Sequence, residues 1–493
     1  MKKYLILIVC SCLLLLTGVA FVACSSDDDG VEQPQVYHVT VEAVLSSDAV
    51  TRALSGGGNS NITSQWAQDE VVYVTKSGTN LGTLAPQSVG SASTKLIGTL
   101  SVSGAPLAVN DELVLTYLKS SAVYSGQKGT LSDIGANFAI AKATVTITEI
   151  SGGIVKTGNA TFTSQQAIVK FSLRGESNEP LNASRLDIKY GSTTLSLTSI
   201  PDATYTANGN GVLYVAVPAF DSQLLTLTAT VGGNTYKYEK PAVSFENGKY
   251  YPVNVRMGKN ESYTPGDHPL TMQALNNGTT ITFDNKATGP VEYSINNGSW
   301  TTLAAAGASG TTSSLNAGDK VYLRGANNTY EDNEGHDSKI SCSGPCYVYG
   351  NFMSLTHESF SSATELIGKS AFCNLFKENT NIRNHPYKDM VLPATTLTEY
   401  CYYGMFWECT GLSRSPIMAD ATASLSEKTK CCYVNMFYNC SGLYYVTCYS
   451  SPADFSYFEP WLVNVQSKGT LVTKSGYESN WNDHKPTGWT VTQ

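Results

Sequence analysis

Residues 405–412 read Met405-Phe406-Trp407-Glu408-Cys409-Thr410-Gly411-Leu412, and residues 436–443 read Met436-Phe437-Tyr438-Asn439-Cys440-Ser441-Gly442-Leu443. A looser first copy has Leu375, Phe376, Asn379 and Ile382 at the matching places, so the phenylalanines are spaced by 30 and 31 residues. A fixed period of about 20 to 50 residues with matching apolar positions is typical of a solenoid, in which each repeat stacks on the next. The last third of the chain is therefore predicted to form a short solenoid of three coils.

Two positions of each repeat are expected to hold the coils together. The first is the aromatic residue, which should line up in adjacent coils at Phe376, Phe406 and Phe437. The second lies three places later and should turn inward to satisfy backbone groups, at Asn379, Cys409 and Cys440. Segment 340–355 and the tail after residue 450 are the candidate caps, with Trp481 and Trp489 expected to cover the last coil.

The cysteines are concentrated in the same region. Of the 12 in the chain, two lie before residue 23, Cys24 follows, and the other nine lie between Cys342 and Cys448. An odd number excludes a complete disulfide framework, so we expect most of them to be small buried thiols in the stack. Cys342 and Cys346 bracket a turn, and the sequence fits a disulfide or two neighbouring thiols there equally well.

The chain before the repeats shows the alternation of short antiparallel strands. Residues 38–44, 143–147 and 225–231 alternate apolar and polar side chains, with Gly, Asn and Pro between them. Such spacing predicts β-sandwiches and a mainly β fold. The expected boundaries are 37–150 and 151–258 for two sandwiches, 259–268 for a linker, 269–350 for a further β domain, 351–450 for the repeats and 451–493 for a cap.

The first residues predict export. Lys2 and Lys3 precede an apolar run, and residues 21–24 end it as Phe-Val-Ala-Cys, so residues 1–23 are interpreted as a signal peptide. The junction resembles a bacterial lipobox, which implies that Cys24 is cleaved and acylated. The acidic segment 24–36 resembles the signal that places lipoproteins on the outer face of the outer membrane; a solvated linker of a periplasmic lipoprotein is the alternative. The net charge of −8 argues against a nucleic-acid partner.

Four motifs together resemble the fimbrillin-like family of pilus subunits and surface lipoproteins. They are Thr-Arg-Ala-Leu at 51–54, Trp-Ala-Gln-Asp-Glu-Val at 66–71, Gln-Ala-Ile-Val-Lys-Phe at 166–171, and Phe-Glu-Asn-Gly-Lys-Tyr-Tyr-Pro-Val-Asn-Val at 245–255. The resemblance covers about residues 37–258 and implies two transthyretin-like sandwiches. The later repeats resemble the BspA-like leucine-rich repeats of bacterial surface proteins, through Phe-x-x-Cys-x-x-Leu at 406–412 and 437–443.

The same resemblance gives Arg52 a possible role in assembly. In the family, a surface protease cuts after an arginine near this point, which here implies cleavage between Arg52 and Ala53. Cleavage would free the first strand and leave a groove that a strand from another subunit fills by main-chain hydrogen bonding. An ordinary exposed arginine in an uncut lipoprotein is the alternative.

No motif for catalysis or for a cofactor was found. The six histidines are scattered, and no zinc-ligand spacing, nucleophile elbow or phosphate loop is present. The acidic segment 332–337 lacks a carboxylate at the first position of a calcium loop, which favours a solvated loop. We therefore expect no enzyme, no metal and no cofactor.

A dense set of aromatic residues accompanies the repeats and suggests recognition. Tyr402, Tyr403, Trp407 and Tyr438 flank the inward positions and are the expected ligand-binding residues, with core packing as the alternative. The sequence thus predicts an outer-membrane adhesin that binds a host protein, a bacterial partner or a glycan, and a fimbrial tip or accessory subunit is the form of adhesin that the resemblance suggests. The alternative is a lipoprotein that captures polysaccharide for uptake.

Overall fold

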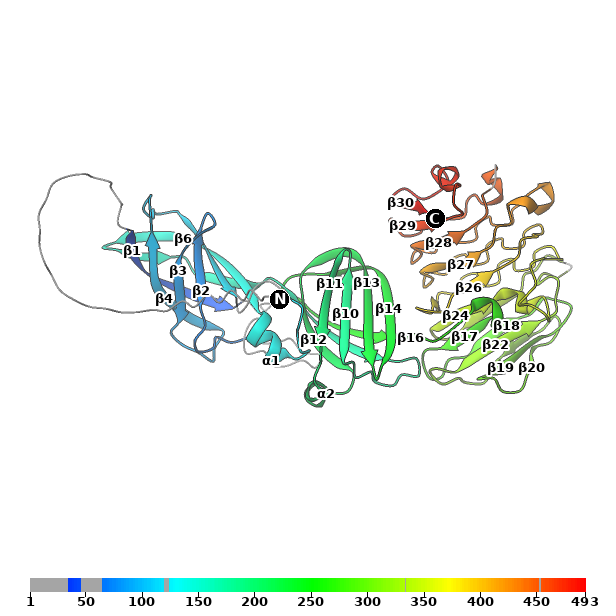
Figure 1. Ribbon diagram of the computed structural model, residues 1–493, viewed down its shortest axis with the longest axis horizontal. Helices are drawn as coiled ribbons and strands as arrows, with labels where there is room; N and C mark the ends of the chain where they lie inside the picture. Colours follow the sequence, from blue (N-terminus) through cyan, green and yellow to red (C-terminus); the bar gives the residue numbers. More distant parts are fainter. Residues whose placement is uncertain (1–33, 46–63, 119–123, 333, 452–453) are drawn as a thin grey trace, which may run out of the picture.

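The computed structural model describes residues 34–45, 64–118, 124–332, 334–451 and 454–493. Their regular secondary structure is mainly β-strand, and the strands form five sheets. Figure 1 shows the blue and cyan strands at one end of the long axis, green strands in the middle, and the yellow-green to red strands together at the other end, with the red ones on the side toward the middle. Within the described residues, no helix is long and apolar enough to cross a bilayer.

The first sheet closes on itself. Its strands are β1 (Gln35–Leu45), β2 (Val72–Lys76), β3 (Thr79–Pro86), β4 (Ser93–Val102), β5 (Glu112–Leu118), β6 (Ile140–Ser151), β7 (Ile154–Thr157) and β8 (Ala160–Ser164). They run in the order β4-β3-β2-β5-β6-β7-β1-β8, and β1 also pairs with β4, so seven strands form a closed ring. The ring surrounds one core, in which Trp66 meets Phe162 edge to face at 5.5 Å.

Two expectations for this region are corrected. We expected two facing sheets, but β1 pairs antiparallel with β4 over ten residues. Because this pairing joins the two ends of the sheet, the ring has no free edge, whereas two separate sheets would each have edges. We also expected the first unit to end at residue 150, but β6 runs through that position. Strands β7 and β8 then return to pair with β1, which extends the sheet to Ser164.

The second unit has two sheets across a shared core. One contains β12 (Val212–Val217), β9 (Ala167–Arg174) and β15 (Tyr250–Arg256) in that order. The other contains β11 (Thr193–Thr198), β10 (Arg185–Tyr190), β13 (Phe220–Val231), β14 (Asn234–Phe245) and β16 (Gly258–Lys259). Phe171 of one sheet and Leu186 and Leu227 of the other are buried in the same cluster. The helices α1 (Leu131–Asp133) and α2 (Asp202–Asn208) are short.

The third unit is one mixed sheet with a small second sheet beside it. The large sheet has the order β20-β19-β22-β17-β24-β26-β27-β28-β29-β30, with β25 on β24, and the small sheet has the order β21-β18-β23. Their bounds are β17 (Thr271–Ala274), β18 (Ile281–Asp284), β19 (Val291–Ile295), β20 (Thr301–Ala304), β21 (Ser309–Thr311), β22 (Lys320–Gly325), β23 (Lys339–Cys342), β24 (Cys346–Asn351), β25 (Ile382–Asn384), β26 (Met390–Leu392), β27 (Arg414–Met418), β28 (Tyr445–Cys448), β29 (Gly469–Val472) and β30 (Trp489–Thr492).

Strand β24 joins the two regions that the sequence led us to separate at residue 350. It pairs antiparallel with β17 on one side and parallel with β25 and β26 on the other. One hydrophobic cluster therefore runs from Leu270 to Trp489. The expected cap after residue 450 also continues the sheet, because β29 and β30 add parallel strands to β28.

Short turns complete the structure. They are one π-turn at Ile134–Phe138 and 3-10 turns at Pro265–Asp267, Phe352–Leu355, Thr422–Ser424, Glu427–Thr429, Phe455–Tyr457 and Glu478–Trp481. The last turn buries Trp481 completely against Phe455, Phe458 and Trp461.

Phenylalanines from successive coils stack inside the third unit. The ring centroids of Phe376 and Phe406 are 5.6 Å apart and those of Phe406 and Phe437 are 5.7 Å apart, with interplanar angles of 12° and 9°. All three side chains are fully buried. Each ring thus contributes both buried area and aromatic packing to the contact between coils.

Replacing the central ring of this stack should destabilise the third unit strongly. Phe406→Ala is expected to lower its free energy of unfolding by about 3–5 kcal/mol, because the cavity lies between two rings that cannot collapse onto each other. The measurement is chemical denaturation followed by tryptophan fluorescence. Ile367→Ala is the control, since this side chain is 61% exposed and its loss should cost less than about 0.5 kcal/mol. Equal losses in the two variants would contradict the stacked arrangement.

Candidate binding surface

Each coil returns to the sheet through a segment that is neither helix nor strand, and its backbone bonds to the next coil. In residues 400–408, every second N–H group donates to a carbonyl of residues 430–438, at 2.8–3.1 Å. The N–H groups between them donate three residues back within their own coil. Both sets of amides are therefore satisfied without regular secondary structure.

A left-handed residue at every fourth position produces this alternation. Tyr400, Gly404 and Glu408 have φ of 55°, 56° and 62°. The corresponding residues of the neighbouring coils also have positive φ; they are Ser370, Asn374, Glu378, Cys431, Asn435 and Asn439. One such residue per turn prevents the segment from winding into a helix, so its amides point alternately inward and toward the next coil. Asparagine and glycine tolerate this backbone conformation best.

The residues three places after the phenylalanines donate to the coil before them. Cys409 Sγ lies 3.0 Å from the carbonyl of Phe376, and Cys440 Sγ lies 2.9 Å from that of Phe406. In the first coil Asn379 Nδ2 donates to the carbonyl of Ile340 at 3.1 Å. All nine cysteines of the described residues are free thiols. Burial raises the pKa of Cys440 to about 12, so this thiol stays protonated and unreactive.

The outward side chains of the same segments form a row of half-buried aromatic residues. Trp407 meets Tyr438 of the next coil at 5.2 Å with the rings tilted by 51°, and Lys377 of the preceding coil lies 4.4 Å from the Trp407 ring centroid. Beside this row, Tyr403 packs on Tyr400 at 5.8 Å and accepts a hydrogen bond of 3.0 Å from Asn435. We call Tyr400, Tyr403, Trp407 and Tyr438 the aromatic face.

Tyr402, which we expected at a binding surface, lies inside the protein. It is 1% exposed, stacks with Phe372 at 6.0 Å, and contacts the ring of Tyr433 at 5.6 Å with the two rings tilted by 33°. These three residues lie four places before the phenylalanines of the main stack, so they form a second internal column. The sequence contained this signal, because Phe372, Tyr402 and Tyr433 repeat with the same period.

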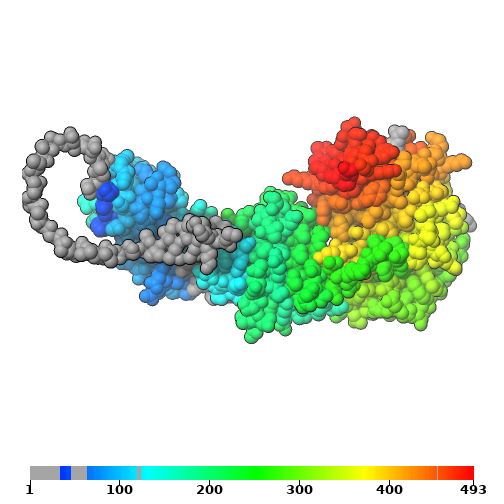
Figure 2. All heavy atoms as spheres, in the orientation of Figure 1, coloured from blue at the N-terminus to red at the C-terminus, as the bar shows by residue number. Residues whose placement is uncertain are grey.

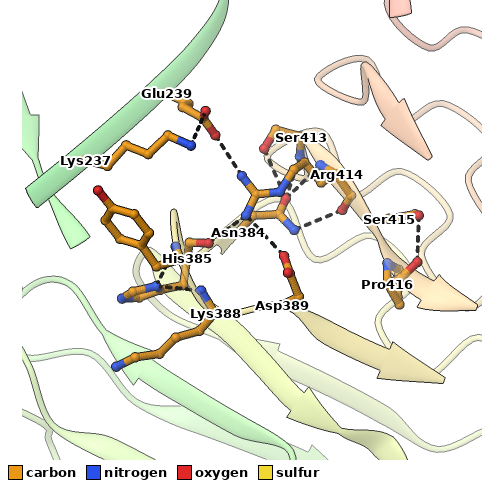
Figure 3. A network of polar contacts seen from close by, with 11 residues as sticks. Lys237, Glu239, Asn384, His385, Lys388, Asp389, Ser413, Arg414, Ser415 and Pro416 are labelled. Carbon is orange, nitrogen blue, oxygen red and sulfur yellow. Dashed lines mark hydrogen bonds and ion pairs between the residues drawn. The ribbon is translucent and has the colours of Figure 1, made fainter. Parts of the chain in front are cut away.

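The second unit lies against the third (Figure 2), and polar side chains join the two (Figure 3). Arg414 at the start of β27 donates from Nη1 to Glu239 of β14 at 2.8 Å and from Nη2 to the carbonyl of His385 at 2.7 Å. Lys237 also contacts Glu239, at 2.7 Å. Asn384 accepts from the backbone N–H of Arg414 at 2.9 Å and donates back to its carbonyl at 2.9 Å, which fixes the arginine on its coil.

A buried histidine and a carboxylate form the second part of this junction. His385 Nε2 donates to Glu176 at 2.8 Å, while its Nδ1 accepts from the backbone N–H groups of Tyr387 and Lys388. This arrangement requires the neutral imidazole with its proton on Nε2. Burial alone would raise the pKa of Glu176, but hydrogen bonds from His385, Gln273 and a backbone amide outweigh it and lower that pKa to about 2.

Sequence reasoning did not find the residues of this junction. His385 lies 209 positions from Glu176 and Arg414 lies 175 positions from Glu239, so neither pairing has a local pattern. The available hint was that basic residues follow the repeat aliphatics closely, as in Ile382-Arg383 and in the Arg414 that follows Leu412.

Several expected sites lie outside the described residues. These are the acylation site Cys24 and the cleavage site between Arg52 and Ala53.

In the acidic loop, Asp332 accepts from the backbone N–H groups of Glu334 and His336 and pairs with the His336 ring at 2.8 Å. Among the residues that the structure describes, no group of three or more His, Cys, Asp or Glu side chains is arranged so that it could hold a metal ion.

Comparisons with known proteins give distant likenesses only. No protein-family model matches the chain, and no functionally curated protein matches it in sequence. Among solved structures, a protein assigned to cell adhesion from Bacteroides ovatus matches with 14% identity and a TM-score of 0.28, over 45% of this chain and 95% of its own. A fimbrial assembly protein from Parabacteroides distasonis matches with 10% identity and a TM-score of 0.26, over 45% and 90%. TM-scores this low support no inference about function.

The junction should make stability depend on pH through His385. Burial lowers the pKa of this imidazole below its ordinary value of 6.5, so below that pH the unfolded chain binds a proton that the folded chain does not. Stability is therefore expected to fall as the pH decreases from about 7 to about 5.5. Glu176 acts in the same direction at lower pH, because the stability it contributes is present above 4.5 and is lost as the pH falls toward about 2.

The corresponding test compares unfolding free energies across this pH range. His385→Gln is expected to lose less stability on acidification than the wild-type protein, because no imidazole remains to take up the proton on unfolding. His38→Gln, at an exposed position of β1, is the matched control. If wild type and His385→Gln show the same pH dependence, His385 does not take up a proton on unfolding.

Proposed function

We propose that this protein is a cell-surface lipoprotein adhesin that contacts its ligand through the aromatic face of the C-terminal coils. The observation that supports this proposal most directly is the row made by Trp407 and Tyr438 on a stacked backbone. Half-exposed Tyr and Trp side chains on a rigid support lose little entropy on binding and are frequent hot spots. Tyr402 is removed from the proposed contact set because it is buried.

The geometry favours a protein ligand over stacked sugar rings at this face. A sugar stacks on an open aromatic ring face, because its C–H groups need close contact over the whole ring. Lys377 covers one face of Trp407 at 4.4 Å, and Tyr438 of the next coil packs against the same ring. The capture of polysaccharide for uptake therefore remains the second candidate for this surface.

The finer fold assignment is part of the proposal. We propose that the second unit is transthyretin-like and that the parallel strands and stacked coils are a leucine-rich-type solenoid. The fimbrillin-like motifs and the one-strand-per-coil pairing from β26 to β30 support these assignments. In this arrangement the two N-terminal units act as a stalk and the coils form the head.

The place of the protein in a fimbria is proposed from its chain order. A shaft subunit donates its last strand to a neighbour, but here more than 230 residues follow Met257. We propose a tip or accessory subunit that accepts a strand. Cleavage after Arg52 would release β1, whose Tyr37, Val39 and Val41 fill the core of the ring, and would leave a long gap beside β4. Other fimbrial subunits are the proposed partners.

The contact surface can be tested with one double variant. Purified protein is applied to an array of matrix proteins, whole bacterial cells and polysaccharides. Trp407→Ala/Tyr438→Ala is expected to weaken protein or cell binding at least about tenfold. Tyr73→Ala is the control, because Tyr73 is 41% exposed and lies on β2, outside the coils. Unchanged binding by the double variant contradicts the proposal, and loss of polysaccharide binding alone favours the second candidate.

Membrane attachment is tested separately at Cys24. The wild-type protein is expected to fractionate with the outer membrane and to yield an acylated N-terminal peptide by mass spectrometry, because two or more acyl chains anchor a protein stably. Cys24→Ala should leave the protein out of the membrane fraction. Protease treatment of intact cells then reports which face the protein occupies. An unmodified Cys24 in the wild-type protein contradicts the anchor.

A further inference from the structure

A groove of ≈ 580 Å³ lies between the second and third units, and none of its lining residues belongs to the aromatic face. Strands β14 and β15 form one side. The other side is formed by the end of β25, the start of β27, and residues 410–411, 413, 441–442 and 466 of the turns. The turns belong to successive coils, which are spaced by roughly 4.8 Å where their strands pair. The groove is therefore about 15 Å long by the same spacing.

Positive charge dominates the groove, although the whole chain carries −8. Lys240, Arg256, Arg383 and Arg414 line it together with a single carboxylate, Glu239. That carboxylate is already neutralised, because Arg414 contacts one of its oxygens at 2.8 Å and Lys237 the other at 2.7 Å.

Within the described part of the chain, two of the arginines bond to backbone carbonyls and not to a carboxylate. Arg256 Nη1 donates to the carbonyl of Gly175 at 3.0 Å, and Arg383 Nη1 donates to the carbonyls of Thr380 and Ile382 at 2.6 and 2.8 Å. Among the described residues, no carboxylate forms an ion pair with Arg256, Arg383 or Lys240. Burial lowers the pKa of both guanidinium groups, while the negative charge of Glu179 acts in the opposite direction on Arg256.

The repeat makes room for Arg383 by means of glycine. A Cβ atom at Gly411 would overlap Arg383 Nη1, so the guanidinium group crosses the next coil directly over its backbone. In the following coil, a Cβ atom at Gly442 would lie 2.5 Å from the carbonyl of Thr410. The glycines that precede Leu412 and Leu443 are therefore needed for close contacts within the protein, Gly411 with the Arg383 side chain and Gly442 with the backbone of the preceding coil.

The remaining lining indicates the class of ligand. Asn254, Thr410 and Ser441 are exposed and bring amide and hydroxyl groups to the groove. Hydroxyl-rich ligands match such groups, and carboxylates match unpaired guanidinium groups by bidentate hydrogen bonds. An acidic peptide would need apolar pockets for its side chains in addition, but the apolar lining consists mainly of prolines and tyrosines.

We propose that this groove binds a short oligosaccharide that carries carboxylate groups, with Arg256 and Arg383 pairing with those carboxylates and Lys240 adding charge at the rim. The site is separate from the aromatic face, so it goes beyond the adhesin function proposed above and does not depend on it. A cationic groove in an acidic protein also attracts an anionic ligand from a distance, and salt weakens this attraction.

The test uses purified full-length protein on an array of oligosaccharides that contain uronic or sialic acids, with carboxyl-reduced counterparts and a polyglutamate peptide. We expect binding to acidic glycans that decreases with salt and is absent for the reduced counterparts. The Arg256→Gln/Arg383→Gln variant should bind at least about tenfold more weakly. Arg185→Gln is the matched control, because this arginine pairs with Asp187 outside the groove.

Folding is checked separately, since Arg383 also supports its turn. Lys240→Gln removes an exposed charge that forms no hydrogen bond or ion pair among the described residues, and it should weaken binding by a smaller factor without changing the thermal midpoint. The proposal is overturned if no acidic glycan binds, if reduced glycans or polyglutamate bind better, or if the double arginine variant binds normally. Loss of attachment in the Trp407/Tyr438 double variant with acidic-glycan binding retained would show that the two surfaces act independently.

Discussion

Backbone hydrogen bonds between successive coils are the interaction on which the C-terminal unit depends. On one side of each coil these bonds form a parallel sheet, and on the other they link segments that contain no regular strand. The second set requires a left-handed residue at every fourth position, as at Tyr400, Gly404 and Glu408. Once the coils are held at this spacing, the phenylalanines must stack inside and Trp407 must meet Tyr438 outside.

The period of the repeat predicted the Phe376–Phe406–Phe437 column, and the alternation of apolar residues predicted a mainly β chain. Both are local patterns that a sequence displays directly. Closure of the first sheet depends on the pairing of β1 with β4. The sequence of β1 contains no local pattern that identifies β4 as its partner. Tyr402 was wrongly expected at the surface because it flanks a residue that points inward. Phe372, Tyr402 and Tyr433 repeat with the period of the coils, and this repeat indicates a second internal column.

The candidate surfaces were predicted unequally for the same reason. Three of the four aromatic residues expected at a surface are half-buried on the outer side of the coils, where a local repeat placed them. The arginine groove was missed entirely, because Arg256 and Arg383 come from different units. The contacts that bring these units together include Arg414 with Glu239, His385 with Glu176 and Tyr347 with the carbonyl of Arg256, and each joins positions far apart in the chain. These contacts hold the second unit against the third, and each unit supplies one wall of the groove.

Amide hydrogen exchange of residues 400–409 and 431–440 tests the central account most directly. These segments contain no strand or α-helix, so ordinary loops of this kind would exchange within seconds to minutes. Because their amides alternately bond within the coil and to the next coil, the account predicts exchange as slow as that of the buried strands β9 and β24. Exchange at the rate of an open loop would contradict stacked coils held together by their backbones.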